Sequence, residues 1–287
     1  MEIAVAASIQ AEEHGEVTRK GSTPRQRLIT AEGRDGLAFR LVRSHYQSAE
    51  KAFETPRHHH SFQQFRWAEI GSLNYGPGQD VEEGDIAYFP RGTYYGPQRR
   101  DHGVGLTLQF GFGLEMLGGK NASSVYREGV AKLRARGRLE DGYYVDVDPE
   151  TGKERRRDPA EAVTEEVTGK KYTIPAEGYA EAILIHPKTA RYYEVGPGVE
   201  VKRLGSFFDH QGSEADARVS MIRLSDGGAY SFGAERAQLA WSISPGLRID
   251  GREYPELTSV YVPLDEEGEI SCSEPVELYV IEFPRLD

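Results

Sequence analysis

The sequence is poor in cysteine: Cys272 is the single one among 287 residues. A disulfide within the chain is therefore impossible, and a metal cluster built on several thiolates is not expected. Basic side chains are also in the minority, because 35 Lys and Arg face 46 Asp and Glu, which gives a net charge of −11. An acidic surface repels phosphate backbones and anionic lipid. We therefore expect no nucleic-acid partner and no membrane-surface role.

Long apolar runs are missing as well. No run of about 18 apolar residues occurs, so a membrane-spanning helix is not predicted. The first residues lack a basic segment followed by an apolar stretch, so no secretory signal is expected. With 38% hydrophobic and 28% charged residues, the chain can still bury a sizeable core. These features favour a soluble cytoplasmic protein.

Glycine (32), tyrosine (16) and proline (15) are abundant, which favours short strands and tight turns. From residue 37 onwards, short aromatic and aliphatic segments alternate with turns such as 74–78 and 95–97. Turn signals spaced by about 8–12 residues predict an all-β barrel or sandwich. The same pattern returns from residue 181. Residues 1–36 are polar and weakly periodic, and we interpret them as an arm that pairs at an edge.

The segment between the two β regions has a helical pattern. A first helix is predicted over 125–136, with a serine before it and a glycine after it. Asp158 and the proline that follows it form a good helix start, and Glu161 is placed to close a capping box. This second helix should end near Gly169.

The two β regions repeat one pattern. Trp67 and Trp241 are the only tryptophans of the chain. Each is followed by a Gly-x4-Gly pair and then by a strand that ends in a proline, Pro90 in the first region and Pro263 in the second. We interpret this correspondence as an internal repeat of one β unit.

Three consecutive histidines, His58, His59 and His60, form a cluster of ligand-type side chains. Alternate side chains of a strand share a face, so His58 and His60 would point one way and His59 the other. Gln64 and Arg66 continue the His58 face. Two imidazoles at this spacing can share a divalent metal ion. The alternative is a polar strand face that binds no metal.

The histidines begin a longer pattern. It is H-x-H-x3-Q-x6-G from His58, followed after 12 residues by G-x5-P-x-G-x2-Y from Gly84. This pattern resembles the two motifs of the cupin superfamily, G-x5-H-x-H-x3,4-E-x6-G and G-x5-P-x-G-x2-H-x3-N. The resemblance covers residues 37–112 well and, through the internal repeat, extends weakly to 190–286.

The resemblance implies an all-β protein with two cupin-type β-barrels joined by a short helical segment. We predict an arm at 1–36, an N-terminal barrel with a metal-type site at 37–114, a connecting helix and hairpin segment at 115–180, and a C-terminal barrel at 181–287. In the second barrel the two histidine places fall on Phe232 and Ala234, so that barrel is expected to lack metal ligands.

Position by position, the resemblance implies that four residues occupy the ligand places: His58, His60, Gln64 and Tyr95. The cofactor would be one divalent transition metal, Fe, Mn, Cu, Ni or Zn. Gln64 replaces the acidic residue of the first motif and Tyr95 the histidine of the second. The amide removes one negative charge, which a tyrosine bound as phenolate would restore. Two further departures are Ala52 for the leading glycine and Arg99 for the asparagine.

The resemblance also implies an intracellular enzyme with a small-molecule substrate. We expect a metal-dependent oxygenase of the dioxygenase kind, acting on a small oxygenated or carboxylated metabolite. Tyr95 and His102 are the predicted catalytic groups, and Arg66 and Arg99 are predicted to bind the substrate. The alternatives are an isomerase, lyase or hydrolase with Tyr95 as acid and base, and a module that binds a small ligand without catalysis. A homodimer is expected because exposed sheet edges must be covered.

Overall fold

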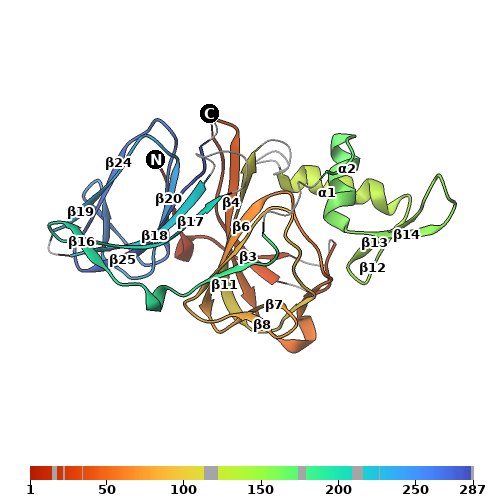
Figure 1. The fold of residues 1–287 in the computed structure, drawn as a ribbon, viewed down its shortest axis with the longest axis horizontal. Coiled ribbons are helices and arrows are strands. Elements are labelled where there is room, and N and C mark those ends of the chain that lie inside the picture. The colour runs from red at the N-terminus through yellow and green to blue at the C-terminus, as the bar shows by residue number, and fades with distance from the viewer. Residues whose placement is uncertain are drawn as a thin grey trace. The chain divides into compact units, whose positions relative to one another are not determined.

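The computed structural model of the chain describes residues 1–14, 18–21, 23–33, 35–112, 122–173, 179–208, 216–225 and 227–285. The chain divides into two compact units (Figure 1). The N-terminal unit comprises Ala11–Glu32 and Gly36–Leu184, and the C-terminal unit comprises Met1–Gln10, Gly33–Asp35 and Ile185–Asp287. Antiparallel sheets make up most of each unit, which confirms the all-β fold with two cupin-type barrels. No helix in the described ranges is long and apolar enough to cross a bilayer.

The main sheet of the N-terminal unit has seven strands within the described ranges. They are β2 (Glu12–His14), β3 (Thr23–Glu32), β4 (Leu37–Tyr46), β6 (Gln63–Ile70), β9 (Ile86–Phe89), β11 (Gly103–Phe112) and β15 (Ile183–Ile185). Their order across the sheet is β15-β9-β6-β11-β4-β3-β2. Smaller elements complete the unit: β5 (Phe53–Thr55) paired with β10 (Gln98–Arg100), β7 (Leu73–Gly76) paired with β8 (Gln79–Val81), and the 3-10 helix η2 (Ala49–Lys51).

The two faces of this sheet differ in chemistry. One row of side chains across β4, β11 and β6 consists of Leu41, Leu108 and Phe65, and all three are fully buried. The next row consists of Arg40, Gln109 and Gln64. Neighbouring residues of a strand point to opposite faces. At these rows one face of the sheet is therefore apolar, and the other carries guanidinium and amide groups.

The C-terminal unit also has a seven-stranded main sheet in its described part. Its strands are β1 (Glu2–Val5), β16 (Tyr193–Gly196), β17 (Val199–Phe208), β18 (Asp216–Leu224), β20 (Gln238–Ser242), β23 (Thr258–Val262) and β25 (Val276–Glu282), in the order β1-β23-β20-β25-β18-β17-β16. A second sheet contains β19 (Ala229–Phe232), β24 (Gly268–Cys272), β21 (Leu247–Ile249) and β22 (Arg252–Tyr254), in that order. The 3-10 helices are η1 (Ala6–Ser8) and η5 (Pro187–Thr189).

The strand orders of the two main sheets confirm the internal repeat. Trp67 lies in β6, which pairs with β9 and β11. Trp241 lies in β20, which pairs with β23 and β25. The remaining strands follow in the same succession on either side. The two tryptophans therefore mark equivalent strands of two copies of one unit.

The described part of residues 1–36, expected as an arm that pairs at an edge, contributes strands to the sheets of both units. β1 pairs with β23, from Glu2 opposite Tyr261 to Val5 opposite Thr258. β2 and β3 instead extend the sheet of the N-terminal unit beside β4. β1 and β2 lie at the ends of the two main sheets, where a strand needs little apolar surface, and their partner strands could not be predicted when they are distant in sequence.

The connecting segment contains α1 (Ala122–Arg134), β12 (Arg138–Glu140), β13 (Tyr143–Val147), β14 (Glu154–Arg157) and α2 (Pro159–Thr168). The side chain of Asp158 accepts a hydrogen bond from the Ala160 N–H at 2.8 Å, and Gly169 ends α2 with a φ of 65°. The helix predicted from Asp158 to Gly169 is therefore confirmed. The first helix begins and ends slightly earlier than the predicted 125–136.

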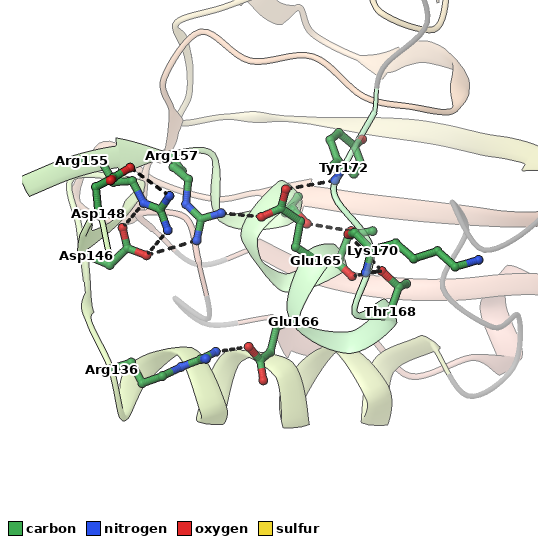
Figure 2. Close-up of polar contacts among 12 residues, drawn as sticks. Arg136, Asp146, Asp148, Arg155, Arg157, Glu165, Glu166, Thr168, Lys170 and Tyr172 are labelled. Carbon is green, nitrogen blue, oxygen red and sulfur yellow. Dashed lines mark hydrogen bonds and ion pairs between the residues drawn. The ribbon is translucent and has the colours of Figure 1, made fainter. Parts of the chain in front are cut away.

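Ion pairs tie the hairpin of this segment to its second helix (Figure 2). Arg155 and Arg157 of β14 both pair with Asp146 of β13. Arg157 also pairs with Glu165 of α2 at 2.5 Å, and Glu165 accepts a hydrogen bond from the Tyr172 N–H. These links hold α2 against the hairpin of β13 and β14.

Candidate functional site

The histidine motif lies between β5 and β6, and the Pro-x-Gly turn of the second motif is bonded directly to it. The Gly92 N–H donates to the His60 carbonyl at 2.9 Å, and the φ of Gly92 is 78°, a conformation that favours glycine. His58 and Tyr95 exchange two backbone hydrogen bonds of 3.0 Å each. The backbone therefore brings Tyr95 beside the histidines.

The imidazoles of His58 and His60 lie together and that of His59 points elsewhere. The ring centroids of His58 and His60 are 4.9 Å apart, and the Tyr95 ring lies 4.5 Å from His58 and 6.0 Å from His60. The Nε2 of His59 instead lies 3.0 Å from the Glu161 carboxylate of α2. The alternation predicted for the three histidines is confirmed, although they lie outside the named strands.

Both clustered imidazoles are neutral at physiological pH. Burial, together with the guanidinium of Arg19, lowers the pKa of His58 to about 3. Burial and the neighbouring His58 lower the pKa of His60 well below its ordinary value. The Nδ1 of His58 lies 2.8 Å from the Pro56 carbonyl, which can only accept, so Nδ1 carries the proton and Nε2 keeps a lone pair. Such an imidazole can act as a metal ligand or as a base.

Arg66 connects the remaining predicted site residues. The hydroxyl oxygen of Tyr95 accepts hydrogen bonds from Gln64 Nε2 at 2.6 Å and from Arg66 Nη2 at 2.9 Å. The Gln64 Oε1 accepts from Arg66 at 3.3 Å and from Gln109 at 3.4 Å. The guanidinium of Arg66 also lies over the rings of Phe89 and Tyr95, 4.6 and 4.8 Å from their centroids. Arg66, Gln64 and Tyr95 thus form one buried polar group.

Two further polar residues that the sequence analysis did not select extend this group. The Gln98 Oε1 accepts from Arg66 Nη1 at 3.2 Å and from Arg100 Nη2 at 2.8 Å. Arg100 Nη1 donates to the Tyr46 hydroxyl at 2.9 Å. Burial lowers the pKa of Arg66 to about 10, so this guanidinium remains charged at neutral pH. The extended group therefore carries buried positive charge.

The structure does not bring Arg99 or His102 into this group. The side chain of Arg99 is 50% exposed and pairs with Glu54 at 2.5 Å, and that of His102 is 76% exposed. Gln98 and Arg100 are buried, whereas Arg99 between them faces outward. The alternation along β10 is the signal that could have identified Arg100 in place of Arg99.

The connecting segment contacts the histidine motif through two side chains that the sequence did not indicate. Glu161, expected to close the capping box of α2, has its carboxylate 3.0 Å from His59 instead. The Tyr172 hydroxyl accepts a hydrogen bond from the Ser61 N–H at 2.8 Å. Neither contact has a local sequence signal, because the partners lie more than a hundred residues apart. The contacts hold the His59 side chain and the Ser61 backbone, on the two sides of His60.

The donor set fits a metal ion through its two histidines. His58 and His60 present neutral imidazoles side by side, whereas the oxygens of Gln64 and Tyr95 already accept hydrogen bonds from Arg66. In the described ranges, no group of three or more His, Cys, Asp or Glu side chains could hold a metal ion. His58 and His60 are therefore the residues that would hold one, and further ligands would come from substrate, water or Tyr95.

The equivalent place in the C-terminal unit is filled by apolar side chains. Gln238 lies opposite the residue before Pro263, as Gln64 lies opposite the residue before Pro90, so the two glutamines correspond. Phe232, at one of the two histidine places, is 1% exposed. It belongs to an apolar cluster of Val199, Ile222, Leu224, Phe232, Ala240, Leu247, Ile249, Val260, Val262, Ile270, Cys272, Val276, Leu278 and Val280.

Two units with one strand order, the first carrying both motifs bonded to each other, define a bicupin fold. Neither a family model nor a curated protein sequence matches the chain. Solved structures match it in fold. A candidate dioxygenase from Nostoc punctiforme PCC 73102 aligns with a TM-score of 0.59 and 8% identity, over 99% of this chain and 82% of that one.

Oxalate decarboxylase from Bacillus subtilis is a second structural match. A tryptophan-to-tyrosine variant aligns with a TM-score of 0.55 and 15% identity, over 99% of this chain and 77% of that one. A structure from work on the Mn(II) centres of the same enzyme aligns with a TM-score of 0.54 and 13% identity, over 100% of this chain and 78% of that one. Identities this low establish the shared fold alone.

Proposed function

We propose that the N-terminal barrel holds the active site of a cupin-type enzyme that acts on a small oxygenated or carboxylated metabolite. His58 and His60 bind one divalent transition metal, and the reaction is an oxygenation. The observation that carries this proposal is the pair of neutral imidazoles beside Tyr95 and Arg66 in a polar interior. The fold neighbours add support, since one is a candidate dioxygenase and another an enzyme with Mn(II) centres.

Each residue of the group has a defined task in this proposal. Arg66 binds the anionic group of the substrate through charge-assisted hydrogen bonds, which are strong in a buried setting. The Tyr95 oxygen accepts from Gln64 and Arg66, so its own O–H proton points away from both and can be donated to a substrate atom. When bound, the metal ion supplies redox or Lewis-acid chemistry.

A second candidate function is acid–base chemistry without a metal, as in an isomerase, lyase or hydrolase. One observation favours it: Arg66 donates to the oxygens of both Gln64 and Tyr95, the two positions where further protein ligands were expected. A fixed guanidinium at this place repels a divalent cation. In this version the neutral imidazole of His58 or His60 removes a proton from the substrate, and Tyr95 returns one.

Elemental analysis of the purified and the metal-loaded protein tests the proposal. Wild type should retain an ion, and His58→Ala and His60→Ala should each lose it while remaining folded. The matched control is His59→Ala, which removes the contacts of His59 to Glu161, to the Gly92 carbonyl and to the Tyr94 ring and should keep the metal. Redox-active Fe, Mn or Cu would support an oxygenase, and Zn a lyase or hydrolase.

Two results would contradict the metal site. One is equal loss of metal in His58→Ala and His59→Ala, because the rings point to different surroundings. The other is a wild-type protein that binds no ion even after loading. The second result would favour the acid–base enzyme if the protein turns over a substrate, and a non-catalytic binding module if it only binds one.

A further inference from the structure

The interior of the N-terminal unit holds four arginines where the C-terminal unit holds apolar side chains. They come from four strands: Arg25 from β3, Arg40 from β4, Arg66 from β6 and Arg100 from β10. The interior cluster of the C-terminal unit is made of apolar side chains and one cysteine. Buried apolar side chains need no partner, whereas guanidinium groups in an interior need a group of opposite charge nearby.

One hydrogen-bond network connects three of these arginines. Arg40 Nε donates to Gln109 Oε1 at 2.5 Å, and Gln109 donates to Gln64 at 3.4 Å. Arg66 donates to the same Gln64 oxygen and, through Gln98, is linked to Arg100. The network therefore crosses the interior from β4 to β10, and its acceptors along this path are neutral amides.

Arg25 faces the same interior. It lies opposite Ser44 on β4, and Ser44 and Arg40 are on one face of that strand because they are four residues apart. Burial, with Arg27 and Arg100 nearby, lowers the pKa of Arg25, and burial with the neighbouring Arg25 lowers the pKa of Arg40 to about 10. Arg25 and Arg40 are half-buried, and each guanidinium group lies close to other cations.

No acidic side chain in the described part of the chain pairs with any of these four arginines. Arg43, on the other face of β4, shows the contrast, because it forms two hydrogen bonds of 2.6 and 2.7 Å with Glu69. Arg40 has a hydrogen-bond partner among the described residues only at Nε, and the buried Nε of Arg25 has none. The interior thus offers guanidinium donors to a ligand that carries negative charge.

The geometry points to a two-point site for a small organic dianion, such as a dicarboxylate or a carboxylate that carries a phosphate. Arg66 binds one anionic group beside His60 and Tyr95, and Arg40 with Arg25 binds the second. Arg40 lies over the Phe62 ring, which stacks on His60 at 4.4 Å, so this second anchor borders the histidines as well. The inference rests on the proposed function, since it names the substrate class of that active site.

Calorimetry on the full chain after treatment with a chelator tests the site independently of any metal. The probes are malonate, succinate and glutarate, with propionate and butyrate as singly charged counterparts and phosphoglycolate as the phosphate-bearing one. At least one dianion should bind tenfold or more tightly than the monocarboxylates. Tighter binding of phosphoglycolate than of the dicarboxylates would support the site and assign a phosphate to one anchor.

Arginine variants identify the second anchor. Arg25→Gln and Arg40→Gln should each weaken binding of the dianion by about tenfold or more, because one charge-assisted contact is lost. Arg43→Gln, on the opposite face of the same strand as Arg40, should bind as wild type does. Without ligand, Arg25→Gln and Arg40→Gln should melt at the same or a higher temperature than wild type, since one unbalanced charge is removed.

Three results would overturn the inference. The first is dianions that bind no better than monocarboxylates, and the second is unchanged dianion binding in Arg40→Gln. The third is a lower melting temperature in both Arg25→Gln and Arg40→Gln, together with an equal loss of dianion and monocarboxylate binding. The last would indicate arginines that only support the fold. The outcome is separate from that of the metal experiment. Loss of metal in His58→Ala does not predict whether chelator-treated protein binds a dianion. Absence of dianion binding likewise does not predict whether His58 and His60 bind a metal ion.

Discussion

At the scale of single residues, Gln64 shows how an amide and a carboxylate would differ at one position. Its nitrogen donates to Tyr95, and its oxygen accepts from Arg66 and Gln109. A glutamate in this place could not donate to Tyr95 when ionised, and it would neutralise Arg66 as an ion pair. The amide instead satisfies its neighbours and leaves the positive charge of Arg66 uncompensated, so that charge is available to a ligand.

Removal of Asp216, a buried carboxylate, should change the pH dependence of stability. Its side chain is 4% exposed and accepts from Ser206 at 2.5 Å, Arg218 at 2.9 Å and Arg236 at 2.7 Å. Burial alone would raise its pKa, but these hydrogen bonds outweigh burial and hold the pKa below its usual value. Such a group stabilises the fold fully above about pH 5 and loses this effect as the pH falls below about 3.9.

We therefore expect Asp216→Asn to lower the free energy of unfolding at pH 7 by about 3 kcal/mol. The variant should also lose less stability than wild type between pH 5 and pH 3. Urea unfolding at several pH values measures both effects. As an internal comparison, Arg236→Gln should cost more than Arg218→Gln, because the Arg236 side chain is 11% exposed and that of Arg218 is 49% exposed. If Asp216→Asn lost as much stability between pH 5 and pH 3 as wild type does, Asp216 would not be the group responsible for this pH dependence.

At the scale of elements, the sequence predicted the features that depend on residues close together in the chain. The proline and glycine of the second motif, the cap at Asp158 and the alternation of His58 and His59 all depend on neighbours in the chain, and the structure agrees with each. Partners distant in sequence were not predictable. Nothing near Glu161 indicates that it contacts His59, and the pairing of β1 with β23 has no local signal.

The same dependence on sequence distance explains the missed interior arginines. Arg25 and Arg40 lie on separate strands, and each has the alternating surroundings of an ordinary surface residue in a half-exposed strand. Only the closure of the sheets turns their side chains towards one another. Arg66 was selected because it follows the histidines by an even number of residues, a relation that the sequence displays directly.

Helix α2 should depend measurably on its cap. Asp158→Ala removes the acceptor for the Ala160 N–H and also the ion pair with Arg19 at 2.6 Å. We expect a loss of about 1–2 kcal/mol in the free energy of unfolding, which urea denaturation measures. Asp158→Asn keeps a good capping side chain and should lose less. Equal losses in the two variants would show that the charge on Asp158, and not its capping bond, stabilises the helix.

At the scale of the whole molecule, we propose that the protein forms a homodimer through an open sheet edge. β16 lies at the end of the main sheet of the C-terminal unit, and Tyr193 and Val195 on this strand are 42% and 55% exposed. An edge strand with exposed apolar side chains is prone to pair with another chain.

Light scattering at micromolar concentration should give a mass twice the 32.0 kDa of the chain. Val195→Lys should shift this mass towards that of one chain, because a lysine on an edge strand opposes pairing. A monomeric wild type would refute the dimer. A dimer that Val195→Lys leaves intact would place the interface on another surface.

The pairing of β1 with β23 has a consequence for the order of events during synthesis. Residues 2–5 leave the ribosome about 250 residues before their partners at 258–261. The early segment must therefore remain without its paired strand during the whole of that interval. Residues 11–32 and 36–184 of the N-terminal unit are translated in the meantime, and the main sheet of the C-terminal unit can be completed only after β23 has been made.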